Sequence, residues 1–216
     1  MPQPTIKICG ITRLEDAEAA ADAAANYIGL IRAESPRAVE LETARAIAQH
    51  VRSRIAPVLL FKDASVDVVF DELNECAVDL AQLHGAEPPE FAAQLLLRLP
   101  NLRLIRAFPV IDGYGVDIAA WLDAATPFAP SILAVILDAP KGAAAIDEDN
   151  FRAVAALVRR RGFNVWRAGG LDAKNVANIA DAAFYDGYDV ARGVESAPGV
   201  KSPALIREFV RSARSR

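Results

Sequence analysis

Two side chains far apart in the sequence, a thiol and a carboxyl group, are suited to moving protons. Cys9 comes directly after residues 5–8, a β-prone run, and a glycine then interrupts the strand. Asp138 follows the apolar residues 132–137, so we expect its carboxyl group at the mouth of a hydrophobic barrel, where partial desolvation favours the protonated acid. On one face of a fold the two groups form a base and acid pair. The alternatives are structural: a small buried cysteine, and an aspartate that caps or turns the chain before a proline.

Glycines, arginines and a histidine follow other predicted strands. The pair Gly169-Gly170 predicts a cradle for a phosphate group, because glycine lets backbone N–H groups approach an anion and a helix starting near Asp172 adds its dipole. The alternative is that these glycines only turn the chain. His84 is a third acid or base candidate, although a histidine in such a place more often bonds the backbone or a neighbouring loop. The candidates at the remaining strand ends are Ser35-Pro36-Arg37, Gln82, Arg167, and Arg192 with Gly193.

One repeated unit must position these candidates: a short apolar strand, a turn and an amphipathic helix. Residues 132–138 are almost entirely apolar, without alternation, as in a parallel strand that is covered on both faces. Ser65, Asp172 and Ser202 precede predicted helices and are typical capping residues. Strands are expected at 5–9, 27–31, 55–61, 79–83, 102–108, 132–138, 163–167 and 185–190. Helices are expected at about 14–24, 40–52, 65–75, 88–97, 115–124, 147–161, 172–183 and 202–214.

Eight strand–helix units in 216 residues predict a single (β/α)8 barrel with short loops, spanning residues 1–216 as one domain. The alternative is an open, doubly wound sheet. No Gly-x-Gly-x-x-Gly follows the first strand, which weakens a dinucleotide-binding form of that sheet. In a barrel, the carboxyl ends of all strands converge on one face, so the candidate residues become neighbours.

Composition limits the classes of partner. Apolar residues make up 53% of the chain, enough for a large core. The net charge is -4 and the basic residues are scattered, so we expect no nucleic-acid partner, and no apolar run approaches the length of a membrane span. Cys9 and Cys76 are the only cysteines, which argues against a disulfide framework and favours the cytoplasm. Cys76 is expected in the core, and without an extra exposed apolar stripe the helices predict a monomer.

Taken together, these residues resemble the phosphoribosylanthranilate isomerase family of tryptophan biosynthesis. The similarity runs along essentially the whole chain, and its opening motif is highly specific. The matching segments are Lys7-Ile8-Cys9-Gly10-Ile11-Thr12, Ser35-Pro36-Arg37, Gln82-Leu83-His84-Gly85, Leu137-Asp138, Gly169-Gly170-Leu171 with Asn175-Val176, and Gly193-Val194-Glu195 with Pro198-Gly199-Val200-Lys201.

The resemblance implies an enzyme that performs an Amadori rearrangement, from an aminoaldose phosphate to an aminoketose phosphate, with no cofactor and no metal. Asp138 would be the acid that protonates the furanose ring oxygen and opens the ring to a Schiff base. Cys9 would be the base that takes the proton from the sugar C2. Arg37 would hold the anthranilate carboxylate. The further residues expected to bind the phosphorylated substrate are Gln82, His84, Gly169, Gly170, Arg192 and Gly193.

The sequence departs from the family pattern on the expected active face. A Gly-Gly-Thr-Gly type loop is replaced by Lys141-Gly142-Ala143-Ala144-Ala145, and two serines by Ala191-Arg192. Arg167 stands at a usually apolar position, and Ser202 at a common aspartate. We therefore predict that Arg192 contacts the anionic end of the substrate, the alternative being an ion pair with Glu195 or Asp189. A paralogue acting on another sugar phosphate, and a non-catalytic ligand-binding barrel, are the alternative functions.

Overall fold

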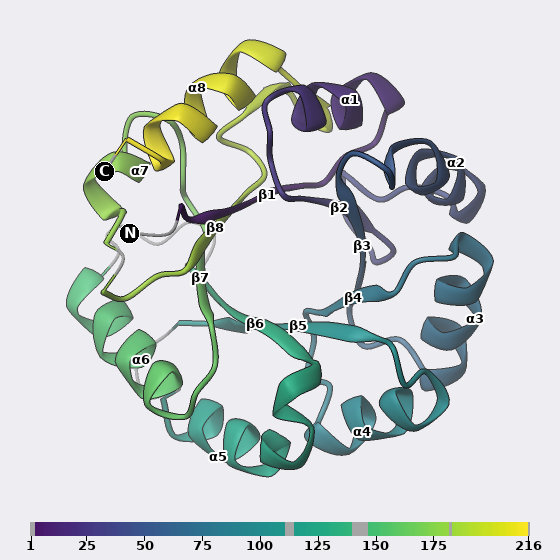
Figure 1. The fold of residues 1–216 in the computed structure, drawn as a ribbon, viewed down its shortest axis with the longest axis vertical. Coiled ribbons are helices and arrows are strands. Elements are labelled where there is room, and N and C mark those ends of the chain that lie inside the picture. Colours follow the sequence, from purple (N-terminus) through teal and green to yellow (C-terminus); the bar gives the residue numbers. More distant parts are fainter. Residues whose placement is uncertain (1–2, 111–114, 140–146, 182, 216) are drawn as a thin grey trace.

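The computed structural model describes residues 3–110, 115–139, 147–181 and 183–215. Within these residues, eight parallel strands close into a barrel in chain order, and helices surround it (Figure 1). The barrel closes because β1 pairs with β8 as well as with β2. The predicted (β/α)8 barrel is confirmed, and the open doubly wound sheet is wrong. The strands are β1 (Thr5–Cys9), β2 (Tyr27–Ile31), β3 (Ala56–Phe61), β4 (Leu80–Leu83), β5 (Arg103–Pro109), β6 (Ile132–Asp138), β7 (Val165–Ala168) and β8 (Gly187–Val190).

The helices follow the strands in alternation. A 3₁₀ helix, Thr126–Ser131, leads into β6, and a short antiparallel hairpin of β9 (Glu195–Ala197) and β10 (Val200–Lys201) follows β8. Among the described residues, no helix is both long and apolar enough to cross a membrane. The helices are α1 (Leu14–Asp22), α2 (Leu41–Val51), α3 (Val66–Cys76), α4 (Pro89–Arg98), α5 (Gly115–Ala125), α6 (Glu148–Arg160), α7 (Val176–Ile179) and α8 (Pro203–Ala213).

The seventh helix is where the sequence expectation was wrong. Instead of a helix over 172–183, the chain forms a turn and then only the four residues of α7. The carboxylate of Asp172 accepts hydrogen bonds from the backbone N–H groups of Lys174 and Asn175, at 2.8 and 2.9 Å. Such a local bond to the backbone competes with helix formation. The loop after β7 therefore lacks the helix dipole that was expected to favour a phosphate group there.

Two predicted caps are found where they were expected. The Ser65 hydroxyl accepts a hydrogen bond from the Val68 N–H, and the Ser202 hydroxyl from the Leu205 N–H. Each bond satisfies one of the backbone donors left free at a helix start. Ser202, one of the departures from the family pattern, thus starts α8.

Along β1, side chains alternate between the barrel interior and the surrounding helices. Ile6 and Ile8 belong to the apolar core, whereas Lys7 and Cys9 share the inward face. Gln82 on β4 and Asp189 on β8 are also buried, so the barrel holds polar side chains beneath its mouth.

Candidate active site

A cavity of about 710 Å³ opens at the carboxyl ends of the barrel strands. It is lined by residues from the carboxyl ends of all eight strands, so side chains distant in the sequence share one space. Two expected residues, Gln82 and Arg167, are absent from its lining. The expected site residues that line it are Cys9, Arg37, His84, Asp138, Gly169, Gly170, Arg192 and Gly193.

Cys9 is the last residue of β1, and its thiol is almost completely buried at the wall of the cavity. Burial raises the pKa of this thiol above its ordinary value, and the positive charge of Lys7 acts in the opposite direction. Gly29 is the neighbour of Cys9 on β2, and a Cβ atom there would lie 2.8 Å from the Cys9 sulfur. A glycine at this position therefore makes room for the thiol.

Asp138 is the last residue of β6, which lies across the barrel from β1 (Figure 1). Its Oδ2 atom lies 3.4 Å from Nε2 of His84, and Nδ1 of His84 lies 3.0 Å from Nε2 of Gln82. With Gln82 donating to Nδ1, the imidazole carries its proton on Nε2 and directs it at the carboxylate. Gln82 thus lies one layer below the cavity and orients His84, which in turn contacts the candidate acid.

A buried ion pair supports the loop that carries His84. Arg106 donates hydrogen bonds to the carbonyl oxygens of Leu83 and Gly85, at 3.0 and 2.8 Å, and pairs with Glu87 at 3.1 Å. Glu87 also accepts from the backbone N–H of Gly85. Since the backbone on both sides of His84 is bonded, the residue is held at the cavity, and Gln82 orients its imidazole.

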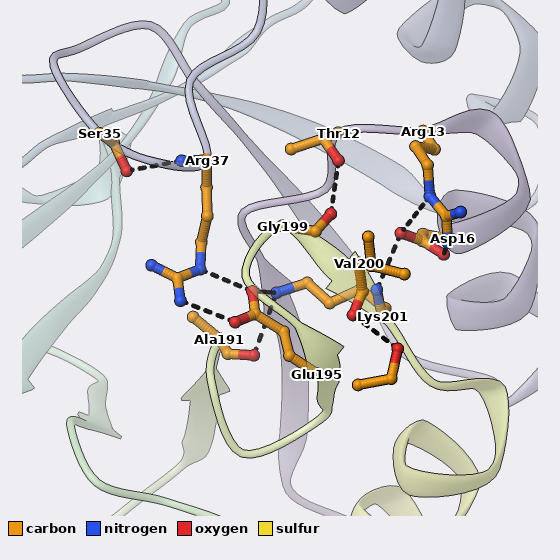
Figure 2. Close-up of polar contacts among 11 residues, drawn as sticks. Thr12, Arg13, Asp16, Ser35, Arg37, Ala191, Glu195, Gly199, Val200 and Lys201 are labelled. Carbon is orange, nitrogen blue, oxygen red and sulfur yellow. Dashed lines mark hydrogen bonds and ion pairs between the residues drawn. The ribbon is translucent and has the colours of Figure 1, made fainter.

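Arg37 is held at the edge of the cavity by a carboxylate from the opposite end of the chain. Its Nε and one terminal nitrogen donate to the two oxygens of Glu195, at 2.6 and 2.7 Å (Figure 2). Lys201 donates to the same carboxylate at 2.8 Å and to the Ala191 carbonyl at 3.0 Å. Burial acts to raise the pKa of Glu195, but the bonds from Arg37 and Lys201 outweigh it, so this pKa is lowered.

The β9–β10 hairpin ties the loops of three strands together. The Thr12 hydroxyl donates to the Gly199 carbonyl at 2.5 Å, and the Lys201 N–H donates to Asp16 at 3.0 Å (Figure 2). Arg13 pairs with the same aspartate. The segment after Cys9, the loop of Arg37 and the loop after β8 are therefore held in fixed relation around the cavity.

The loop after β7 requires glycine. Gly169 and Gly170 have φ values of +83° and +69°, in the left-handed region that side chains disfavour. A Cβ on Gly169 would also lie 2.7 Å from Oδ1 of Asp138. Asn175 donates to the Gly170 carbonyl at 2.7 Å and holds the turn from behind. The backbone of this loop thus passes directly against the candidate acid.

Comparison with known proteins identifies a family for this chain. The family model for N-(5'-phosphoribosyl)anthranilate isomerase matches residues 6–212. The chain belongs to this family. A protein of Geobacter metallireducens with that name is 37% identical over 213 residues, which cover 97% of this chain and 98% of that protein. A crystal structure of the isomerase from Thermus thermophilus has a TM-score of 0.80 and 34% identity, and covers 98% of both chains.

A further phosphoribosylanthranilate isomerase structure contains a ligand. It is a complex with reduced 1-(o-carboxyphenylamino)-1-deoxyribulose 5-phosphate, at a TM-score of 0.80 and 25% identity, and the match covers 99% of this chain and all of that chain. Among the described residues of this family member, no group of three or more His, Cys, Asp or Glu side chains is placed to hold a metal ion.

Arg192, one of the departures from the isomerase family pattern, lies at the cavity. Arg192 is exposed and lines the cavity, and within the described parts of the chain it has no ion pair. Its two expected alternative partners are occupied, since Glu195 bonds Arg37 and Lys201 while Asp189 bonds Lys7. The loop 141–145, another departure, lies outside the described residues.

Arg167 was expected on the active face, but it points away from the cavity toward α6. It is fully buried, and its guanidinium lies 3.7 Å from the ring centre of Phe151 and 3.3 Å from Glu148. The same guanidinium donates to the carbonyl oxygens of Ala168 and Gly169, at the start of the glycine loop. Since neighbouring residues of a strand face opposite sides, Ala168 takes the inward position and Arg167 the outward one.

The predicted site residues did not include four charged residues in and under this isomerase site, Lys7, Asp189, Glu195 and Lys201. A signal was present for Lys7, because it stands two residues before Cys9 in the same strand and therefore on the same face. Glu195 and Lys201 lie in segments that resemble the family, and Asp189 and Glu195 were considered only as partners of Arg192. Their spacing gave no signal that Asp189 pairs with Lys7 or Glu195 with Arg37, because these pairs join opposite ends of the chain.

Proposed function

We propose that this protein converts N-(5'-phosphoribosyl)anthranilate into the corresponding aminoketose phosphate, with Asp138 as the general acid and Cys9 as the general base. One observation carries the proposal: in a chain of the isomerase family, a carboxyl group and a thiol from opposite strands line the same cavity. An aldose-to-ketose rearrangement requires an acid near the ring oxygen and a base near C2, on two sides of the sugar.

The first step opens the sugar ring. Asp138 donates its proton to the furanose ring oxygen, the bond from that oxygen to C1 breaks, and the lone pair of the anthranilate nitrogen forms the C1=N bond of a Schiff base. His84 Nε2, 3.4 Å from the carboxyl group, then stabilises the carboxylate that remains.

The second step moves a proton from C2. The Cys9 thiolate takes this proton, an S–H bond forms as the C2–H bond breaks, and the electron pair becomes the C1=C2 bond of an enolamine. The positive charge on nitrogen is neutralised in the same step, and tautomerisation of the enolamine yields the ketone.

The two ends of the substrate fit the cations on the cavity wall. Arg37 uses two of its five N–H groups on Glu195, which leaves the others for the anthranilate carboxylate. Arg192, with the backbone of Gly169, Gly170 and Gly193, would hold the phosphate group. A guanidinium binds phosphate with charge-assisted hydrogen bonds and so replaces the hydroxyl groups of the family pattern.

Arg192 lines the cavity without an ion pair to any described residue, and this also favours a second candidate function, the isomerisation of another phosphorylated amino sugar by the same acid and base. The experiment that separates the two follows the fluorescence of anthranilate-type substrates with purified protein, without added metal or nucleotide. Loss of fluorescence supports the first function. If the protein is folded but gives no turnover at high enzyme concentration, the first function is contradicted and the second function remains.

We also propose that the protein is a monomer in the cytoplasm. The described residues include only two large exposed apolar side chains, Val68 and Leu97, which lie on different helices. Two cysteines without a disulfide are compatible with a reducing compartment. An isomerase of Thermotoga maritima is described as dimeric, and monomers have been generated from it. Light scattering at several protein concentrations tests the monomer, and a mass of twice the chain contradicts it.

A further inference from the structure

A buried ion pair lies directly beneath the cavity. Lys7 is completely buried, Asp189 is 8% exposed, and Nζ of Lys7 lies 3.0 Å from Oδ1 of Asp189. The two residues are direct neighbours in the pairing of β1 with β8. A completely buried ammonium group in a barrel interior is costly, and a barrel core is ordinarily filled by apolar side chains. The pair therefore calls for an explanation beyond packing.

The ammonium group of Lys7 lies next to the Cys9 thiol. Lys7 and Cys9 are two residues apart on β1 and face the same side. Gly29 on the adjacent strand leaves open the space in which they meet: a Cβ atom there would lie 2.8 Å from the Cys9 sulfur and 3.0 Å from Nζ of Lys7. The sulfur of Cys9 and Nζ of Lys7 thus both lie within 3.0 Å of the position that this Cβ atom would take.

We propose that Lys7 is a positioning residue that stabilises the thiolate form of Cys9, and that Asp189 holds the Lys7 ammonium group beneath the sulfur. The role of that thiolate as the base for C2 rests on the proposed function. The stabilisation itself does not, because it is a property of the protein without substrate.

The other charges around the thiol agree with this assignment. Besides Lys7, the cations of Lys201 on β10 and Arg37 after β2 interact with Cys9, and Asp189 is the anion that does so. Burial acts to raise the thiol pKa, and the largest opposing contribution is the charge of Lys7. Asp189 disfavours the thiolate, but its contribution is smaller than that of Lys7. An aspartate serves here because it keeps the cation in place.

The two partners have opposite electrostatic effects on the thiol, so each can be tested by its own substitution. Without the Lys7 charge, the thiolate loses its nearest cation and faces Asp189. Without the Asp189 charge, the thiolate becomes the only close anion available to Lys7. Lys7→Met should therefore raise the thiol pKa, and Asp189→Asn should lower it.

The test is a thiolate titration by ultraviolet absorbance against pH, on the full chain in a Cys76→Ala background. That background removes the second thiol, whose pKa burial raises to about 11. Cys9→Ala in the same background supplies the blank for tyrosinate absorbance. Lys7→Met should move the midpoint upward by at least about one pH unit, a tenfold lower thiolate fraction at a given pH. Asp189→Asn should move it downward.

An unchanged midpoint in Lys7→Met, or shifts in the same direction in both variants, overturns the proposal. Circular dichroism shows whether each variant is folded, because each single change leaves a buried charge unpaired. If a single variant does not fold, the double variant Lys7→Met/Asp189→Asn, which removes both charges, carries the test. Its midpoint should still rise, since the attraction by Lys7 exceeds the repulsion by Asp189, and an unchanged or lower midpoint contradicts the proposal.

A kinetic measurement links the inference to the reaction. In Lys7→Met, the rise of kcat/KM with pH should move to higher pH together with the titration midpoint. If the wild type does not turn over phosphoribosylanthranilate but the titrations shift as stated, the proposed function fails and the stabilised thiolate stands. If the enzyme is active and the titrations do not shift, only the assignment of Lys7 fails.

Discussion

Several ionisable side chains at the cavity are paired with other side chains before any substrate arrives. Arg37 is fixed by Glu195, Lys7 by Asp189, and the carboxyl group of Asp138 contacts His84. Groups held in this way need little reorganisation when charge moves in a reaction. Arg192 and Lys62 differ, because both line the cavity, both are exposed, and neither has an ion pair among the described residues. At the scale of single residues, these two side chains are available to bind an anion, and only the guanidinium of Arg192 can do so with a fork of N–H donors.

Arg192→Ala should therefore weaken binding more than chemistry. Loss of a charge-assisted hydrogen bond to phosphate costs about 1.5–3 kcal/mol, so KM should rise about tenfold or more while kcat changes little. Inorganic phosphate should become a weaker competitive inhibitor to a similar extent. Steady-state kinetics with and without phosphate measure both effects. Arg207→Ala, an exposed arginine on α8, is the matched control, and an unchanged KM in Arg192→Ala would assign this residue a purely structural role.

At the scale of elements, the loop after β7 is built from two sides. On the cavity side, Gly169 and Gly170 bring the backbone against Asp138. On the helix side, the buried guanidinium of Arg167 donates to the carbonyl oxygens of Ala168 and Gly169 and stacks on Phe151 of α6. The arginine thus supports the start of the loop from the helix side.

Arg167→Leu is expected to loosen this loop. Two backbone carbonyl oxygens and Glu148 lose their donor, which should destabilise the fold by roughly 1–3 kcal/mol. Because the loop faces the cavity, KM should rise while kcat falls less. Thermal unfolding and steady-state kinetics test the two effects separately. A variant that unfolds earlier but keeps the KM of the wild type would show that Arg167 supports the core and not the loop.

The seventh helix is the element whose length could not be predicted from the sequence. Strands such as β6 could be predicted because an uninterrupted apolar run is a local property. The helix expected over 172–183 depends on contacts that are not local. Asp172 is a residue type that often caps a helix, but here its carboxylate accepts hydrogen bonds from the N–H groups of a turn. The helix that follows, α7, has only four residues. An aspartate can either cap a helix or stabilise a turn, and contacts with the surrounding loops determine which of the two forms.

At the scale of the whole molecule, the hairpin after β8 joins the end of the chain to its beginning. Through Glu195 it holds Arg37 and Lys201, and through Gly199 it holds Thr12 (Figure 2). Such contacts between distant segments cannot be read from spacing, which is why the pairing of Glu195 with Arg37 was not predicted. The shared cavity of Cys9 and Asp138 could be expected, because both residues end strands of one barrel.

Glu195→Gln should reveal this connection in the pH dependence of stability. The pKa of Glu195 is lowered in the fold, so the ionised group stabilises the protein above the ordinary pKa of a glutamate. That contribution is lost as the pH falls through the lowered pKa. At neutral pH the variant should be less stable by up to about 3 kcal/mol, because Arg37 and Lys201 lose their shared anion. Denaturant unfolding at several pH values checks this, and a difference from the wild type that does not shrink in acid contradicts it.

The central claim is that Cys9 and Asp138 act together as base and acid across one cavity. The most direct measurement is kcat for Cys9→Ala and Asp138→Asn, with phosphoribosylanthranilate as the substrate and circular dichroism as the control for folding. General acid or base catalysis contributes about 10²–10⁴-fold, so each variant should lose that factor in kcat while remaining folded. Near-wild-type turnover in Cys9→Ala would contradict the account and make Cys9 an ordinary buried cysteine.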